Sequence, residues 1–148
     1  MHATVRSVIE ASGDTPKDIC ILDTEASPEH LSRGTAQYAD AMLAVVEPYY
    51  KSLETGRRMS LLAKDLGLPR VALVANKVRD ERELEAVTEF AAKHDLEVAA
   101  VIPFDERMPE AERAEAAPLD HAPDAKAVAA IGELAQQFSG NGRGNGRA

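Results

Sequence analysis

Four short apolar runs recur along the chain, and stretches with helical periodicity separate them. The runs cover Ile19–Leu22, Asp40–Glu47, Arg70–Asn76 and Leu96–Pro103. A continuous apolar run with β-branched residues is typical of a strand buried on both faces, as in a parallel sheet covered by helices. Strands that alternate with helices predict parallel pairing through right-handed crossovers. The sequence therefore predicts an α/β fold with a parallel sheet and helices on both faces.

The stretches around these runs carry the spacing and end signals of helices. We predict helices over residues 3–12, 29–38, 52–66, 80–94 and 124–138. Ser52 is a candidate N-cap for the third of them, and Gly67 is its predicted stop. Asp80 and Glu83 have the spacing of a capping box at the start of the fourth.

The length and apolar content suffice for one domain. The chain has 148 residues, of which 45% are hydrophobic, and no internal repeat. We assign residues 1–138 to a single α/β domain, in which residues 104–123 form a charged loop with one helical turn around residues 110–114. The Gly-rich tail, residues 139–148, lacks core-forming side chains and is predicted to be disordered.

Charge and cysteine content exclude several classes of function. The net charge of −8 argues against a nucleic-acid surface and against binding to anionic membranes. The single cysteine, Cys20, rules out an internal disulfide or a cysteine-pair metal site, and its place within an apolar run predicts a small buried hydrophobe. No apolar run reaches membrane-spanning length, and the N-terminus lacks the apolar core of a signal peptide. We predict a soluble cytoplasmic protein without nucleic-acid or membrane partners.

Polar residues follow three of the apolar runs. They are Asp23-Thr24-Glu25, Asn76-Lys77 and Pro103-Phe104-Asp105. Since the carboxyl ends of parallel strands meet at one edge of a sheet, these groups should converge on one crevice. A carboxylate at Asp23 either faces a metal ion or caps the next helix. The Asn76 amide can pair with a purine edge and the Lys77 stem can lie against its ring, although an ordinary turn also contains such residues.

Several segments together resemble a known family. DTEASPEHLSRGT, DAMLAVVEP, SLETGRR, VALVANKV and IPFDE occur in that order. This string is similar to the MinD/ParA-type ATPases, P-loop NTPases of the SIMIBI class with a deviant Walker motif. Within them it most resembles the CooC-type accessory ATPases for nickel insertion into carbon monoxide dehydrogenase. The resemblance runs from about Ile19 to Phe138.

The resemblance implies roles for individual residues. Asp23 would be the catalytic switch II aspartate near Mg²⁺, and ATP would be the nucleotide. The base side of the nucleotide site would comprise Asn76, Lys77, Pro103, Phe104 and Asp105. The switch II segment and the dimer face would comprise Thr24, Glu25, Glu29, His30 and Arg33. Arg79 stands where guanine-reading GTPases have an aspartate, so adenine is favoured.

The resemblance also implies partners. They are a second copy or a P-loop-bearing half, together with a metalloenzyme client. A lone His30 beside Glu29 and Arg33 suits an interface better than a metal ligand, and we predict no metal cluster.

The chain lacks the motif that binds phosphates in this family. It contains no G-x-x-x-x-G-K-[ST] and no deviant lysine–glycine loop, and it also lacks the CxC pair of the nickel-linked members. By the resemblance, the first strand, the P-loop and the switch I aspartate would lie upstream of residue 1. That strand would pair between Ile19–Leu22 and Asp40–Glu47, so its absence leaves a gap or a closed-up sheet.

Three functional hypotheses follow. The first is a partial ATPase that retains the adenine side of the site and does not hydrolyse ATP alone. The second is a non-catalytic module that pairs with a full-length ATPase or another protein through its exposed strand edges. The third is an unrelated α/β ligand-binding domain of the flavodoxin or receiver type.

Overall fold

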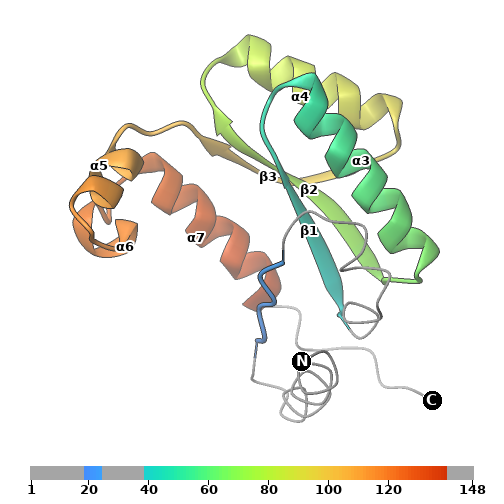
Figure 1. Cartoon of the computed structure of the whole chain (residues 1–148), viewed down its shortest axis with the longest axis horizontal. Coiled ribbons are helices and arrows are strands. Elements are labelled where there is room, and N and C mark those ends of the chain that lie inside the picture. Colours follow the sequence, from blue (N-terminus) through green and yellow to red (C-terminus); the bar gives the residue numbers. More distant parts are fainter. Residues whose placement is uncertain (1–18, 25–38, 140–148) are drawn as a thin grey trace.

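The computed structural model describes residues 19–24 and 39–139, and its centre is a three-stranded parallel sheet in the order β1-β2-β3 (Figure 1). The strands are β1 (Ala41–Val46), β2 (Arg70–Val78) and β3 (Glu97–Pro103). The helices are α3 (Tyr50–Asp65), α4 (Glu81–Lys93), α5 (Arg107–Arg113), α6 (Pro118–His121) and α7 (Lys126–Ser139). Each strand leads to the next through a helix, as the alternating pattern predicted. No helix in the described ranges has the length and apolar character needed to cross a membrane.

The central strand, β2, pairs differently with its two neighbours. Its register with β1 is unbroken from Ala41↔Arg70 to Val46↔Ala75. Its register with β3 shifts twice, once after Leu73 and again between Ala75 and Val78. The second shift coincides with Asn76-Lys77, so the candidate site lies at an irregularity of the sheet.

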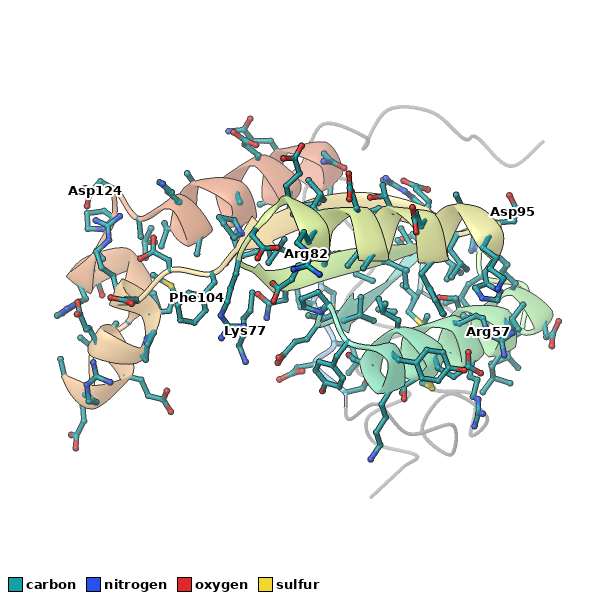
Figure 2. All side chains as sticks on the ribbon, turned by 90° about the horizontal axis from the view of Figure 1, so that it is seen from above. Arg57, Lys77, Arg82, Asp95, Phe104 and Asp124 are labelled. Carbon is teal, nitrogen blue, oxygen red and sulfur yellow. The ribbon has the colours of Figure 1, made fainter. Side chains whose placement is uncertain are left out.

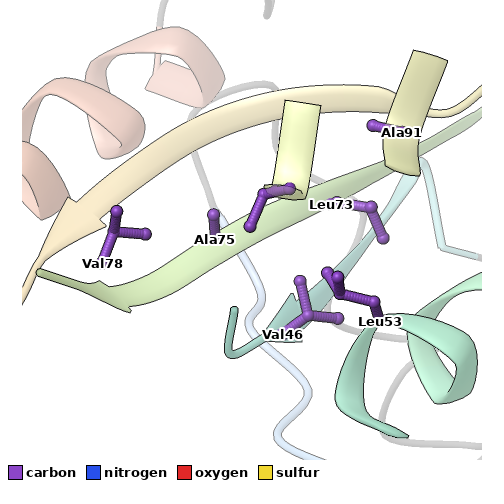
Figure 3. Packing of buried hydrophobic residues seen from close by; sticks show 7 residues of the cluster. Val46, Leu53, Leu73, Ala75, Val78 and Ala91 are labelled. Carbon is purple, nitrogen blue, oxygen red and sulfur yellow. The ribbon is translucent and has the colours of Figure 1, made fainter. Parts of the chain in front are cut away.

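One face of the sheet is covered by α3 and α4. Figure 3 shows the buried cluster, in which strand residues such as Leu73 and Val46 meet Leu53 of α3 and Ala91 of α4. A Cβ built on Gly56 of α3 would collide with the Val46 side chain. The absence of a side chain at this position therefore lets α3 lie close to β1.

Among the described residues, the opposite face is covered by α7, which lies over β2 and β3, and Leu43 of β1 packs against the cluster beneath it. Val74 of β2 and Ile102 of β3 are buried against Ala127 of α7. Val45, the β1 partner of Val74, is 63% exposed while Val74 is 1% exposed. Helices on both faces confirm the predicted fold class, and within the described ranges Val45 is left largely uncovered on this second face.

The helix boundaries correct several local predictions. Ser52 is not the N-cap of α3, which begins at Tyr50; its Oγ instead accepts a hydrogen bond from the Glu47 backbone N–H at 2.9 Å. Gly67 follows the end of α3 with a φ of 82°, as predicted. The predicted loop over residues 104–123 is largely helical, because α5 and α6 form within it.

The predicted strand at Ile19–Leu22 is wrong for this structure. The segment is irregular, Ile21 is 87% exposed, and Cys20 is exposed rather than buried. A strand gains its stability from a neighbour's backbone groups and from cover on its faces. The sheet offers this segment neither, since it pairs with no described strand. The predicted helices over residues 3–12 and 29–38 and the tail from residue 140 lie outside the described residues.

Candidate functional site

The loops that follow β2 and β3 meet at one edge of the sheet. Val78 pairs with Pro103, and the Phe104 backbone N–H donates to the Val78 carbonyl at 2.8 Å. Figure 2 shows Lys77 and Phe104 on these adjoining strand ends. The structure thus brings Asn76-Lys77 and Pro103-Phe104-Asp105 together, as the parallel-sheet argument predicted.

Lys77 holds the backbone of this edge in an unusual conformation. Its φ is 58°, in the left-handed region that residues with a side chain rarely adopt. The side chain makes a 2.8 Å ion pair between Nζ and Glu47 Oε1, which joins the ends of β2 and β1. Left-handed residues at bulges re-aim neighbouring side chains and are frequent at functional sites.

Asn76 lies beside this bulge and is half-buried. Its amide makes no hydrogen bond to another residue in the described ranges, whereas Lys77 next to it is paired. The amide carries both a donor and an acceptor, and that pair is what a purine edge requires. Asn76 is therefore the polar group at this edge that is available to a ligand.

Arg79 and Phe104 form a stacked pair that the sequence reasoning missed. The Arg79 guanidinium carbon lies 4.4 Å from the centroid of the Phe104 ring. The Arg79 backbone N–H donates to Glu83 Oε2 at 2.7 Å, and the Glu83 N–H donates to Asp80 Oδ1 at 2.9 Å. The predicted capping box is half right, because Glu83 reaches Arg79 rather than the N-cap residue itself. The pair presents aromatic and guanidinium surfaces suited to a planar base.

Asp105 fixes the loop that carries Phe104. Its carboxylate accepts from the backbone N–H of Arg107 at 3.0 Å and of Lys126 at 2.9 Å, which ties together the starts of α5 and α7. The Arg107 guanidinium bridges from Asp105 to Asp124, with Nη1 donating to Oδ1 at 2.9 Å. The hydrogen bond from the Arg107 backbone lowers the pKa of Asp105. Both carboxylate oxygens are engaged, so Asp105 acts on this edge by positioning the loop.

The other predicted site residues are not assembled with this edge. Asp23 and Thr24 are exposed in the irregular segment, and no hydrogen bond or ion pair joins Asp23 to another described residue. Glu25, Glu29, His30 and Arg33 lie outside the described ranges, so their roles in switch II and in a dimer stay predictions. Within those ranges no group of three or more His, Cys, Asp or Glu side chains could hold a metal ion.

The residues at this edge match the needs of the ATP base but not those of its phosphates and Mg²⁺. The amide of Asn76 and the ring of Phe104 are the kinds of group that contact a base. The triphosphate and its Mg²⁺ need backbone N–H groups, a lysine and a hydroxyl from a glycine loop. The edge formed by the β2 and β3 loops does not offer that set, and Lys77 is engaged by Glu47. The described edge thus offers groups of the kind that contact a base but not the set that contacts phosphates.

Comparison with curated proteins reveals an ATP-binding protein and an accessory protein as relatives. The chain is 41% identical over 91 residues to an uncharacterised ATP-binding protein of Methanocaldococcus jannaschii, a match that covers 62% of this chain and 35% of that protein. It is 33% identical over 113 residues to the carbon monoxide dehydrogenase accessory protein CooC of Rhodospirillum rubrum, a match that covers 76% of this chain and 42% of CooC. The chain thus spans about two fifths of the length of these relatives. No family model matches it.

Comparison with solved structures reveals the fold. A chain of the MinC:MinD cell division protein complex of Aquifex aeolicus matches with a TM-score of 0.73 and 19% identity, over 95% of this chain and 58% of that one. A ParA family ATPase from Chlorobium tepidum matches with a TM-score of 0.63 and 21% identity, over 76% of this chain and 47% of that one. In sequence the chain is similar to ATP-binding proteins and to CooC, and its fold is that of the MinD/ParA-type ATPases, which confirms the resemblance predicted from its motifs.

Proposed function

We propose that this chain supplies the adenine-binding side of an ATP site in a MinD/ParA/CooC-like protein. The observation that carries the proposal is the convergence of Asn76 and Phe104 at the paired ends of β2 and β3. The ATP-binding relatives support the choice of nucleotide. The wider function is an ATP-dependent dimerising switch that serves metallocentre maturation or partitioning, with a metalloenzyme as its client in the first case.

Adenine suits this edge better than guanine because the nearby carboxylates are occupied. Guanine presents two N–H donors on one edge, and a carboxylate accepts both well. Asp80 accepts from the Glu83 N–H, and Glu83 accepts from the Arg79 N–H, so both are engaged at the start of α4. The Asn76 amide can instead donate to and accept from an adenine edge.

The phosphate side of the site comes from outside this edge. A P-loop-bearing polypeptide, from another chain or from another part of a longer protein, supplies the glycine loop and the lysine. Asp23 would be the residue that helps to hold Mg²⁺, and Thr24, Glu25, Glu29, His30 and Arg33 would form the moving segment and the dimer face. The chain by itself does not hydrolyse ATP.

A non-catalytic interaction module is the second candidate function. The observation that favours it is the exposed surface of β1, where Val45 is 63% exposed at the edge of a parallel sheet. Such a module would bind a full-length ATPase or another partner without contributing to a nucleotide site.

Calorimetry with Mg-ATP separates the two functions. The chain is titrated alone and after co-purification with a P-loop half from a CooC-type ATPase. The adenine-side proposal predicts no binding alone, and binding in the complex that favours ATP over GTP. Asn76→Ala should then weaken ATP binding at least tenfold, while Gln136→Ala, on the exposed surface of α7, should leave it unchanged. A complex that forms without binding nucleotide would support the interaction module instead.

A further inference from the structure

We infer that Arg79 controls access to the proposed base site: its guanidinium covers the Phe104 ring, and a base stacks on that ring only after the guanidinium has moved toward Glu83. The inference rests on the proposed function, because it concerns the same site and adds how that site is regulated. Three observations on the described residues carry it. They are the spacing of the Arg79–Phe104 pair, the place of the ring outside the buried core, and a second partner for the guanidinium at Glu83.

The spacing between Arg79 and Phe104 leaves no room for a base between them. The guanidinium carbon lies 4.4 Å from the centroid of the ring. A base stacked between two planar groups would lie about 3.5 Å from each, so the carbon and the centroid would have to be about 7 Å apart. Each surface suits a planar base, but here the two surfaces contact each other. Arg79 therefore competes with a base for this face of the ring.

The Phe104 ring lies outside the buried core. It is half-buried and belongs to none of the buried apolar clusters that the described residues form. The backbone beneath it is fixed, because the Phe104 N–H donates to the Val78 carbonyl at 2.8 Å. The ring can therefore exchange the guanidinium for a planar ligand without any rearrangement of the core.

Glu83 offers the Arg79 guanidinium a second partner. Its Oε1 lies 3.9 Å from Nη1 of Arg79, an ion pair too long for a hydrogen bond. Its Oε2 accepts from the Arg79 backbone N–H at 2.7 Å, which keeps the carboxylate beside the arginine. Movement of the guanidinium toward Oε1 would form a charge-assisted hydrogen bond of about 2.8 Å and would uncover the ring. The structure thus contains both the covered state and the partner that would stabilise the uncovered one.

The strengths of these contacts allow a base to displace Arg79. The Arg79 side chain is 58% exposed, and a solvent-exposed cation–π pair changes an equilibrium constant by about two- to fivefold. Stacking of a base on an aromatic ring changes it by about fivefold to a hundredfold. The covered state therefore lowers the affinity for a base without abolishing binding.

NMR of the full chain alone tests the covered state. The ring current of Phe104 should shift the Arg79 Hε signal upfield, and Phe104→Leu should remove that shift. The Hε signal of Arg82, which is exposed on α4 and lies apart from Phe104 in Figure 2, serves as the reference. Coincident Arg79 and Arg82 signals that Phe104→Leu does not move would overturn the inference.

Calorimetry with Mg-ATP tests the competition, with the chain in complex with the P-loop half of a CooC-type ATPase. Arg79→Ala should tighten ATP binding by about two- to fivefold because it uncovers the ring. Arg82→Ala, which removes the same charge from the exposed surface of α4, should leave the affinity unchanged. This pair of variants separates uncovering of the ring from the change in net charge.

Glu83→Gln tests the second partner of the guanidinium. Glutamine keeps an oxygen that accepts from the Arg79 backbone N–H, but it removes the charge that attracts the guanidinium. Its effect on ATP affinity should be less favourable, by up to about fivefold, when Arg79 is present than in the Arg79→Ala background. Equal effects in the two backgrounds would contradict the role of Glu83.

Two further results of the calorimetry would overturn the inference. Weaker ATP binding by Arg79→Ala would show that Arg79 holds the base, and an unchanged affinity would show that the ring face is not contested. In both cases ATP still binds, so the proposed function stands. If ATP binds neither to the wild-type complex nor to the Arg79→Ala complex, the proposed function itself fails, and the inference fails with it.

Discussion

Lys77 shows how a single residue shapes the candidate site. Its φ of 58° costs free energy for any residue with a side chain. The ion pair with Glu47 is exposed to solvent, so it offsets little of that cost. The bulge places Asn76 beside the Phe104 loop, so the strained backbone coincides with the proposed base contact. We interpret this position as a conformation kept for binding.

Glycine and alanine substitutions at Lys77 separate strain from charge, because both remove the ion pair with Glu47. Lys77→Gly should be more stable than Lys77→Ala by about 1 kcal/mol in urea unfolding, since glycine adopts a positive φ without penalty. Glu47→Gln serves as the control for the loss of the ion pair alone. Equal stability of the Lys77→Ala and Lys77→Gly variants would contradict the strain at this residue.

Glu54 on α3 predicts a pH dependence of stability. Hydrogen bonds from Arg57 first, and then from Arg58, lower the pKa of Glu54 from 4.5 to about 2. A carboxyl group with a lowered folded-state pKa stabilises the fold fully above its unfolded pKa and loses that contribution as the pH falls. The urea concentration at the midpoint of unfolding should therefore decrease as the pH is lowered from 4.5 to about 2. Glu54→Gln should make this decrease smaller. The same substitution at Glu85, exposed on α4, should leave the slope unchanged.

At the scale of elements, two glycines in helices give opposite predictions. Gly56 of α3 faces Val46, whereas a Cβ added to Gly132 of α7 would have no neighbour within 4 Å. Gly132→Ala should stabilise the protein by up to about 1 kcal/mol through helix propensity. Gly56→Ala gains the same propensity but overpacks the α3–β1 contact at a cost of about 1–3 kcal/mol, and should be destabilising.

A double mutant tests whether the destabilisation by Gly56→Ala arises at the contact with Val46. In a Val46→Ala background the added methyl group has room, so the same substitution should become neutral or stabilising. Chemical denaturation of the four proteins of this cycle gives the coupling free energy. Additive effects would show that α3 does not approach β1 as closely as the structure describes.

The sequence predicts the elements whose signals are local. Apolar runs located β1, β2 and β3, and Gly67 marked the end of α3, because burial and a positive φ restrict the residue types at those places. Ile19–Leu22 has the same apolar signal but is not a strand, since its pairing depends on a neighbour that no local pattern reveals. Of the helices over residues 107–121 only a turn around residues 110–114 was predicted, because helices this short carry no periodic apolar stripe.

The sequence predicted which strand ends form the candidate site, but it did not predict the contacts between their side chains. Asn76 and Phe104 were predicted to lie at the same edge because parallel strands bring their carboxyl ends together. The stack of Arg79 on Phe104 and the engagement of both Asp105 oxygens depend on loop conformation, which spacing does not encode.

At the scale of the whole molecule, we predict that the purified chain does not hydrolyse ATP. The described edge offers a base contact, and the sequence contains no glycine loop for phosphates. Phosphate release should equal that of buffer. Turnover that survives Asp23→Ala would contradict the role of Asp23, and turnover that requires Asp23 would show that the chain provides its own phosphate site.

The most direct test of the central claim is an NMR titration of the isotope-labelled chain, in complex with an unlabelled P-loop half, with Mg-ATP. We expect the largest amide shifts at Asn76–Arg79 and at Phe104–Asp105, at the end of β2 and in the segments that follow β2 and β3. A pocket at the other end of the strands, where β2 and β3 begin, is lined in part by Lys64, Arg70 and Asp95. The amide shifts around this pocket serve as the comparison within the same spectra. Shifts concentrated there, or saturation with no change at Asn76 and Phe104, would contradict an adenine site at the β2–β3 edge.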